Sequence, residues 1–262
     1  MSVREDRNSR QSDGYLGALR MKWRVVICLY ISLASFVLSG AESEVLPFYK
    51  GGDISMITRF EKEGLVLKEK GKPVDLFKVM MRHGCNTFWV RLFVNPNGKG
   101  GVIQDLDYVI ALGKRMKGER ALFMLDFHYS DTWADPGHQH VPAAWKDLSF
   151  DGLEKKVEVY TRDVLQKCKK AGCSPDLVQI GNEIQTGIMK PFGEYRKDGG
   201  GWGPYGRLLN AGVRGARGSG VPAKIIIHSH AGGKTGKCCL RWGRFGRSRY
   251  SSDGSDRSDW RV

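Results

Sequence analysis

The segment Val178–Ile184, with the sequence VQIGNEI, ends an apolar stretch with an amide and a carboxylate side by side. Cleavage of a glycosidic bond needs a carboxylic acid that protonates the leaving oxygen. Glu183 could supply this acid, and Asn182 could hydrogen-bond the sugar hydroxyl next to the reacting carbon. The same two residues could instead cap a following helix, which is the commoner role for an isolated Asn-Glu pair.

A second group of chemically capable side chains lies in the segment Leu125–Trp145, LDFHYSDTWADPGHQHVPAAW. Exposed tryptophan rings stack on sugar faces, and Asp and His side chains hydrogen-bond hydroxyl groups. An ordinary long loop whose aromatic residues fold back onto its own core would have the same composition, so both interpretations stay open. The candidate sugar-binding residues of this loop are His128, Tyr129, Asp131, Trp133, Asp135 and Trp145, with the tyrosine and tryptophan rings expected to stack on sugar faces.

The elements that must position these residues alternate along the chain. Near-continuous apolar runs predict buried strands at Asp53–Ile57, Asn86–Val94, Ala121–His128, Leu177–Glu183 and Ala223–His230. Segments with helical period predict helices within residues 73–84, 105–118, 151–172 and 205–220. In the third helix we expect Asp151 to cap the start and Gly172 the end. This alternation predicts a parallel sheet with helical crossovers.

The position of the polar residues separates two parallel-sheet folds. A (β/α) barrel gathers functional groups at the carboxyl ends of its strands. A dinucleotide-binding sheet needs a glycine-rich motif after its first strand, and none is found there. We therefore expect a barrel. The polar residues at strand ends are Arg91, Asn95, Asp126, His128, Asn182, Glu183, His228 and His230.

Several motifs together carry a family resemblance. They are GGDISM at Gly51–Met56, VRLFVNP at Val90–Pro96, MLDFHYSDTWADPGHQ at Met124–Gln139, YTRDVL at Tyr160–Leu165 and DLVQIGNEI at Asp176–Ile184. In this order and spacing they resemble the arabinogalactan endo-β-1,4-galactanases of glycoside hydrolase family 53. The resemblance implies a (β/α)8 TIM barrel of the retaining glycosidase clan and endo-acting hydrolysis of β-1,4-galactosidic linkages in arabinogalactans. It implies a polysaccharide substrate and a hydrolysis reaction that requires no metal or organic cofactor.

The resemblance also implies roles for individual residues. Glu183 matches the acid/base, and Arg91 matches an arginine beneath the nucleophile. Where the family often has a second arginine, this chain has Trp89. The residues implied to bind the sugar are Asn182, Arg91, His128, Asp131, Trp133, Asp135 and His228.

The chain departs from the family after the fifth predicted strand. Nothing beyond His230 reads as strands six to eight, so we expect an incomplete barrel that lacks the seventh-strand nucleophile. Glu194, the next acid after Glu183, falls in a loop. Retaining hydrolysis needs two carboxylates, so the chain as written is expected to be inactive or nearly so. A non-catalytic galactan-binding remnant and a basic protein that binds polyanions remain as alternatives.

The two ends of the chain differ from its middle. Residues 1–41 contain a basic start at Met21–Arg24 and the apolar run 25–41, which predict a secretory signal peptide or an uncleaved membrane anchor. Residues 45–231 form the expected barrel domain, and residues 232–262 read as a low-complexity, disordered tail. We expect a secreted monomer that meets a membrane only if the first segment stays attached.

Charge and cysteine content exclude other classes. The net charge is +14, and the two ends contribute much of it. No nucleic-acid-binding motif accompanies this charge, so no nucleic-acid partner is expected. Cys85, Cys168 and Cys173 are the cysteines of the barrel segment, and their spacing predicts neither a metal site nor a disulfide framework, with one pair at most.

Overall fold

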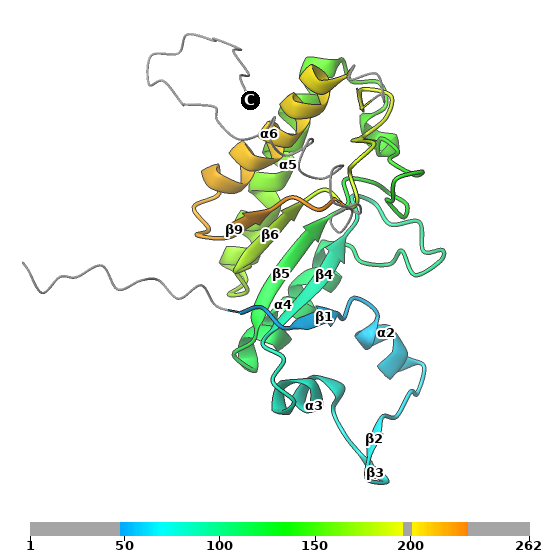
Figure 1. Cartoon of the computed structure of the whole chain (residues 1–262), viewed down its shortest axis with the longest axis vertical. Helices are drawn as coiled ribbons and strands as arrows, with labels where there is room; N and C mark the ends of the chain where they lie inside the picture. Colours follow the sequence, from blue (N-terminus) through cyan, green and yellow to red (C-terminus); the bar gives the residue numbers. More distant parts are fainter. Residues whose placement is uncertain (1–47, 196–200, 230–262) are drawn as a thin grey trace, which may run out of the picture. The chain divides into compact units, whose positions relative to one another are not determined.

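The computed structural model describes residues 48–195 and 201–229 (Figure 1). From Tyr49 onward these residues belong to one compact unit. The expected signal or anchor segment, the expected tail and His230 lie outside the described residues.

A five-stranded parallel sheet forms the centre of the unit. Its strands are β1 (Gly51–Asp53), β4 (Thr87–Leu92), β5 (Leu122–Phe127), β6 (Leu177–Ile180) and β9 (Lys224–Ile226), and they lie in this order across the sheet. A doubly wound sheet reverses its strand order at a switch point, whereas a (β/α) barrel adds each strand beside the one before it. The order therefore confirms the barrel prediction, with five consecutive strands among the described residues.

The helices occupy the segments in which a helical period was predicted. They are α3 (Leu76–Arg82), α4 (Leu106–Gly118), α5 (Phe150–Lys170) and α6 (Trp202–Gly218), with the short α2 (Ile57–Lys62) and the 3-10 turn η1 (Ala143–Trp145) besides. Two small hairpins complete the described chain, β2 (Lys68–Glu69) with β3 (Lys72–Pro73), and β7 (Gly187–Ile188) with β8 (Gly193–Glu194). None of the helices in residues 48–195 and 201–229 has the length and apolar character needed to traverse a bilayer.

The predicted start of α5 was wrong. Ser149 caps this helix, because its hydroxyl accepts the backbone N–H of Gly152 and its own backbone is still extended. Asp151 already lies in the first turn, where its carboxylate pairs with Arg207 of α6 instead. The predicted end is confirmed, since Gly172 follows the C-cap with φ of +77°.

The first strand begins and ends earlier than predicted. It ends at Asp53, whose Oδ1 accepts both the backbone N–H (2.8 Å) and the hydroxyl (2.5 Å) of Ser55. This local turn redirects the chain into α2, which starts at Ile57. Gly51 sits so close to β4 that a Cβ there would lie 1.5 Å from the carbonyl oxygen of Thr87.

The two faces of the sheet differ in chemistry. The face toward the helices is apolar and buried: Phe88, Val90, Leu92, Phe123, Leu125, Phe127, Val178 and Ile180. On the opposite face the strand register aligns Arg91 of β4 with Asp126 of β5, and Asp126 with Gln179 of β6. A row of polar side chains therefore crosses the inner face near the carboxyl ends of the strands.

The cysteines contribute to the core as free thiols. Cys168 and Cys173 are fully buried and Cys85 is half-buried, and none of the three forms a disulfide. The thiol of Cys173 donates to the carbonyl oxygen of Cys168 at 3.4 Å. Among the described cysteines, then, not even the single pair that the sequence left open is formed.

Candidate active site

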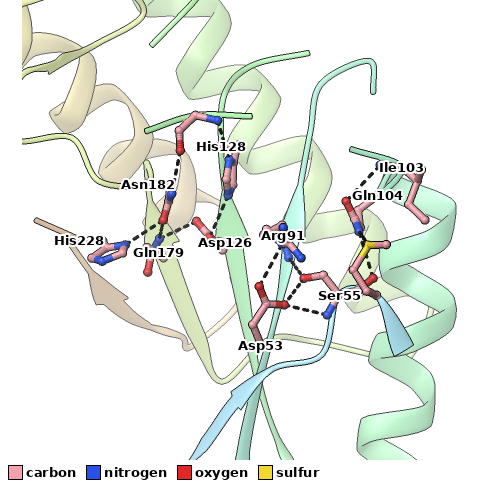
Figure 2. A network of polar contacts seen from close by, with 12 residues as sticks. Asp53, Ser55, Arg91, Ile103, Gln104, Asp126, His128, Gln179, Asn182 and His228 are labelled. Atoms are coloured by element: carbon pink, nitrogen blue, oxygen red, sulfur yellow. Dashed lines mark hydrogen bonds and ion pairs between the residues drawn. The ribbon is translucent and has the colours of Figure 1, made fainter. Parts of the chain in front are cut away.

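The polar row at the carboxyl ends of the strands continues into a hydrogen-bonded network (Figure 2). Gln179 donates from Nε2 to Oδ1 of Asp126 at 2.6 Å and to Oδ1 of Asn182 at 3.3 Å. All three side chains are buried. A buried carboxylate and a buried amide are stable here because they satisfy one another.

Arg91 joins the first strand to the second. Its Nε lies 3.1 Å from Oδ2 of Asp53, an ion pair whose angle is too poor for a hydrogen bond. Its backbone N–H donates to the hydroxyl of Ser55 at 3.0 Å. The guanidinium carbon lies 4.7 Å from the ring centroid of Trp133, a distance suited to cation–π attraction. Trp133 itself is 41% exposed, so its ring is supported from beneath and open to a ligand.

His128 connects the third strand to the loop that follows. Its Nδ1 accepts the backbone N–H of Ala134 at 3.3 Å, so the neutral ring carries its proton on Nε2. Nε2 lies 3.3 Å from Oδ2 of Asp126, without hydrogen-bond geometry. The ring of Trp133 meets His128 edge-on at 5.6 Å between centroids. His128 is completely buried and therefore holds the loop rather than facing solvent.

Asn182 is the most heavily bonded member of the network. Its Oδ1 accepts from Gln179 and faces Nδ1 of His228 at 2.8 Å, and its Nδ2 donates to the carbonyl oxygen of Ala134 at 2.8 Å. Within residues 48–195 and 201–229, Nδ2 has no second acceptor, which leaves its other hydrogen for a ligand. The amide is thus fixed in orientation with one donor to spare.

Glu183 follows Asn182 in an unusual backbone conformation. Its φ is +48°, in the left-handed region that residues with a Cβ seldom adopt. Such conformations cost about 1–3 kcal/mol and concentrate at functional sites. Tyr129, which lies in the loop just after β5, has the same φ of +48°. Glu183 is half-buried at the carboxyl end of the sheet.

Asp131 and Asp135, both expected to line sugar subsites, bind loop backbone. Asp131 accepts the N–H of Asn95 at 2.9 Å and of Ala143 at 2.8 Å, one on each oxygen. Asp135 accepts the N–H groups of Gly137 and His138 and pairs with the His138 ring at 2.9 Å. Burial opposes ionisation of Asp135, but these hydrogen bonds outweigh it and hold its pKa below the usual range. Both carboxylates shape the loop, and direct sugar contact by them stays a prediction.

A cavity of about 460 Å³ opens between this loop and the segment after β6. Its lining combines the apolar Phe192 and Val141 with the cationic Lys146 and Lys190. Mixed walls of this kind suit a hydroxyl-rich ligand, which offers both apolar faces and hydrogen-bonding edges.

The structure brings five of the predicted site residues into one connected set of contacts: Arg91, His128, Trp133, Asn182 and His228. The rings of Tyr129 and Trp145, which were expected to be exposed to a sugar, are instead buried in the core. No site role was predicted for four polar residues that hold the connected set, Asp53, Asp126, Gln139 and Gln179, although Asp126 was noted as a strand-end residue. Asp126 and Gln179 could have been found from their period-two position opposite the apolar face, whereas Gln139 has no such signal. In the described part of the chain, no three His, Cys, Asp or Glu side chains are grouped to hold a metal ion.

Comparison with known proteins gives a consistent result. The family model described as glycosyl hydrolase family 53 matches residues 49–243. The arabinogalactan endo-β-1,4-galactanase of Thermothelomyces thermophilus is 38% identical over 183 residues, which cover 69% of this chain and 53% of that protein. The endo-β-1,4-galactanase of Bacillus subtilis is 35% identical over 187 residues, which cover 69% of this chain and 42% of that protein. The chain spans about half the length of the curated relatives it matches.

Solved structures agree with the sequence comparison. One of two fungal β-1,4-galactanases superposes with a TM-score of 0.63 at 38% identity, over 69% of this chain and 53% of its own. The family 53 catalytic domain of Ignisphaera aggregans gives 0.65 at 31% identity, over 71% of this chain and 53% of its own. The five described strands are accordingly part of a (β/α)8 barrel. With a family model matched over most of its length and relatives more than 30% identical, the chain belongs to glycosyl hydrolase family 53.

Proposed function

We propose that this protein hydrolyses β-1,4-galactosidic linkages within arabinogalactans, with Glu183 as the acid/base. The observation that carries the proposal is the left-handed backbone of Glu183 directly after the bonded amide of Asn182. The strained backbone of Glu183 would serve catalysis by directing its carboxyl group toward a bound sugar. The galactanase names of the relatives supply the substrate class.

Glu183 would give its proton to the oxygen that links two galactose units as the bond to the anomeric carbon breaks. It would then take a proton from the water that releases the second product. Asn182 would donate its remaining Nδ2 hydrogen to the neighbouring sugar hydroxyl. The exposed ring of Trp133 would stack on a sugar face, with Arg91 fixing its position.

A retaining reaction also needs a carboxylate that attacks the anomeric carbon about 5–5.5 Å from the acid/base. Two carboxylates of the inner face are already committed, Asp53 to Arg91 and Asp126 to Gln179. Glu194 lies exposed on the β7–β8 hairpin. We propose that none of the carboxylates in residues 48–195 and 201–229 is the nucleophile.

The test is reducing-end release from soluble β-1,4-galactan by the full chain. We expect Glu183→Gln to abolish any release and the matched control Glu194→Gln to retain it. A second arm adds azide, because a small anion can occupy the place of a missing carboxylate and attack the anomeric carbon. In that arm we expect a galactosyl azide whose formation depends on Glu183. Sugar binding without either product would instead indicate a non-catalytic galactan-binding protein.

We further propose that the protein is secreted and acts as a monomer. The basic start at Met21–Arg24 and the apolar run 25–41 of the sequence support secretion. Detection of the protein in culture medium, with its N-terminus read by mass spectrometry, tests this proposal. Retention in the membrane fraction would favour an uncleaved anchor.

A further inference from the structure

A glutamine from the long loop after β5 touches the peptide on which the proposed acid/base is built. Gln139 is 2% exposed, and its Nε2 donates to the backbone carbonyl oxygen of Asn182 at 2.8 Å. The same nitrogen donates to the carbonyl oxygen of Asp135 at 3.0 Å. Both hydrogens of the buried Gln139 amide nitrogen are therefore donated, one to a carbonyl of its own loop and one to a carbonyl of the loop after β6.

The carbonyl that Gln139 binds belongs to the peptide immediately before Glu183. The direction of that carbonyl is tied to φ of Glu183, because both rotate with the same peptide plane. Without a partner the peptide could turn over and relieve the left-handed φ of +48°. Where ψ of Asn182 does not compensate for the change in φ of Glu183, the Cα–Cβ bond of Glu183 also turns away from its present direction.

The backbone of Gln139 is itself anchored. Its carbonyl oxygen accepts the N–H of Lys190 at 2.7 Å, and the hydroxyl of Thr186 donates to the carbonyl oxygen of Pro136 at 2.7 Å. These bonds fasten the loop of residues 131–141 to the segment that follows Glu183. Gln139 thus reaches the Asn182–Glu183 peptide from a rigid base.

We infer that Gln139 is a positioning residue that holds the Asn182–Glu183 peptide in its strained orientation and thereby aims the carboxyl group of Glu183. The catalytic part of this inference rests on the proposed function of Glu183. The structural part, the hold on the peptide, can be measured without turnover. Gln139 itself touches no substrate in this scheme.

The test compares Gln139→Met with Gln104→Met in the full chain. Methionine matches glutamine in size and has no N–H group. Gln104 is the matched control, because it is also buried and donates from Nε2 to a loop carbonyl, that of Ser55, at 3.0 Å. Hydrogen exchange is followed at the amide of Ile184, which donates to the carbonyl oxygen of His228 at 3.1 Å.

We expect the Ile184 amide to exchange more than about tenfold faster in Gln139→Met and within about twofold of wild type in Gln104→Met. On galactan we expect kcat to fall more than about tenfold in Gln139→Met with KM within about twofold, because Trp133 and Arg91 are untouched. Equal exchange in the two variants, or a rise in KM with kcat unchanged, would overturn the inference. If the wild-type chain releases no sugar, the proposed function fails on that arm while the exchange comparison still decides the role of Gln139.

Should Gln139→Met fail to fold, Gln139→Glu takes its place. Glutamate keeps the length of the side chain and can donate one O–H bond when protonated, below about pH 4 for an ordinary carboxyl group. After correction for intrinsic exchange, we expect protection of Ile184 to return in part at low pH. No return of protection would count against the inference.

Discussion

The guanidinium carbon of Arg91 lies 4.7 Å from the ring centroid of Trp133, so a buried strand residue supports the most exposed aromatic ring of the site. On its other side the same guanidinium pairs with Asp53 at 3.1 Å. Strand β1, strand β4 and the loop after β5 therefore meet at one cation. A sugar that stacks on Trp133 would contact a ring whose position is set by the sheet and not by the loop alone.

Removal of the Trp133 ring should weaken sugar binding without unfolding the protein. For Trp133→Ala we expect a loss of about 1–2 kcal/mol in binding free energy, or roughly a 5- to 30-fold rise in Kd for a galactotetraose. Calorimetric titration of the full chain measures this value. Phe60→Ala is the matched control, because Phe60 is 43% exposed on α2 and belongs to no part of the site. Equal affinity in Trp133→Ala and wild type would remove Trp133 from the proposed sugar site.

The fold was largely predictable because its signals are periodic. The apolar residues of α5 recur every three or four positions, and each strand has a buried face that repeats every two. The first strand was misplaced because its end depends on a side chain: Asp53 binds Ser55 and turns the chain before the apolar run is finished. A run of apolar letters does not reveal such a bond.

The site was predictable only in part, for a related reason. Asp131 has the residue type and loop location of a sugar ligand, yet both of its oxygens bind backbone N–H groups. Gln139 lies 43 positions from Asn182 along the chain, and no local pattern indicates that the two touch. Whether a polar residue binds substrate or supports another residue depends on contacts that only the folded chain defines.

The close approach of α5 and α6 (Figure 1) should depend on one glycine. A Cβ at Gly215 would lie 2.3 Å from the backbone carbonyl oxygen of Glu158 on α5, and backbone cannot move aside as a side chain can. We expect Gly215→Ala to lower the free energy of unfolding by about 1–3 kcal/mol in urea denaturation. Gly206 lies on the same helix with no atom within 4 Å of its Cβ position. There the same change should raise stability by about 0.5–1 kcal/mol, and two equal losses would contradict this packing.

Alkaline pH should destabilise the protein through Tyr129. Burial raises the pKa of this phenol far above its usual range, against the opposing effect of its 2.7 Å hydrogen bond with Thr161. Because the folded pKa exceeds the unfolded value of about 10, the folded chain retains a proton that the unfolded chain loses. The stabilising effect is complete below about pH 10 and declines above it by about 1.4 kcal/mol per pH unit.

Two variants separate the phenol from its hydrogen bond. Tyr129→Phe removes the phenol hydroxyl and its hydrogen bond. We expect its free energy of unfolding to lie about 1 kcal/mol below that of wild type at pH 8 and to equal it by about pH 11, because wild type loses stability as its unfolded phenol ionises. Thr161→Val removes the hydrogen bond alone, so its deficit should persist at both pH values. Urea denaturation at pH 8 and pH 11 gives the four differences from wild type. Parallel behaviour of the two variants would show that Tyr129 does not govern the alkaline limit, since only the phenol can release the proton on which the argument depends.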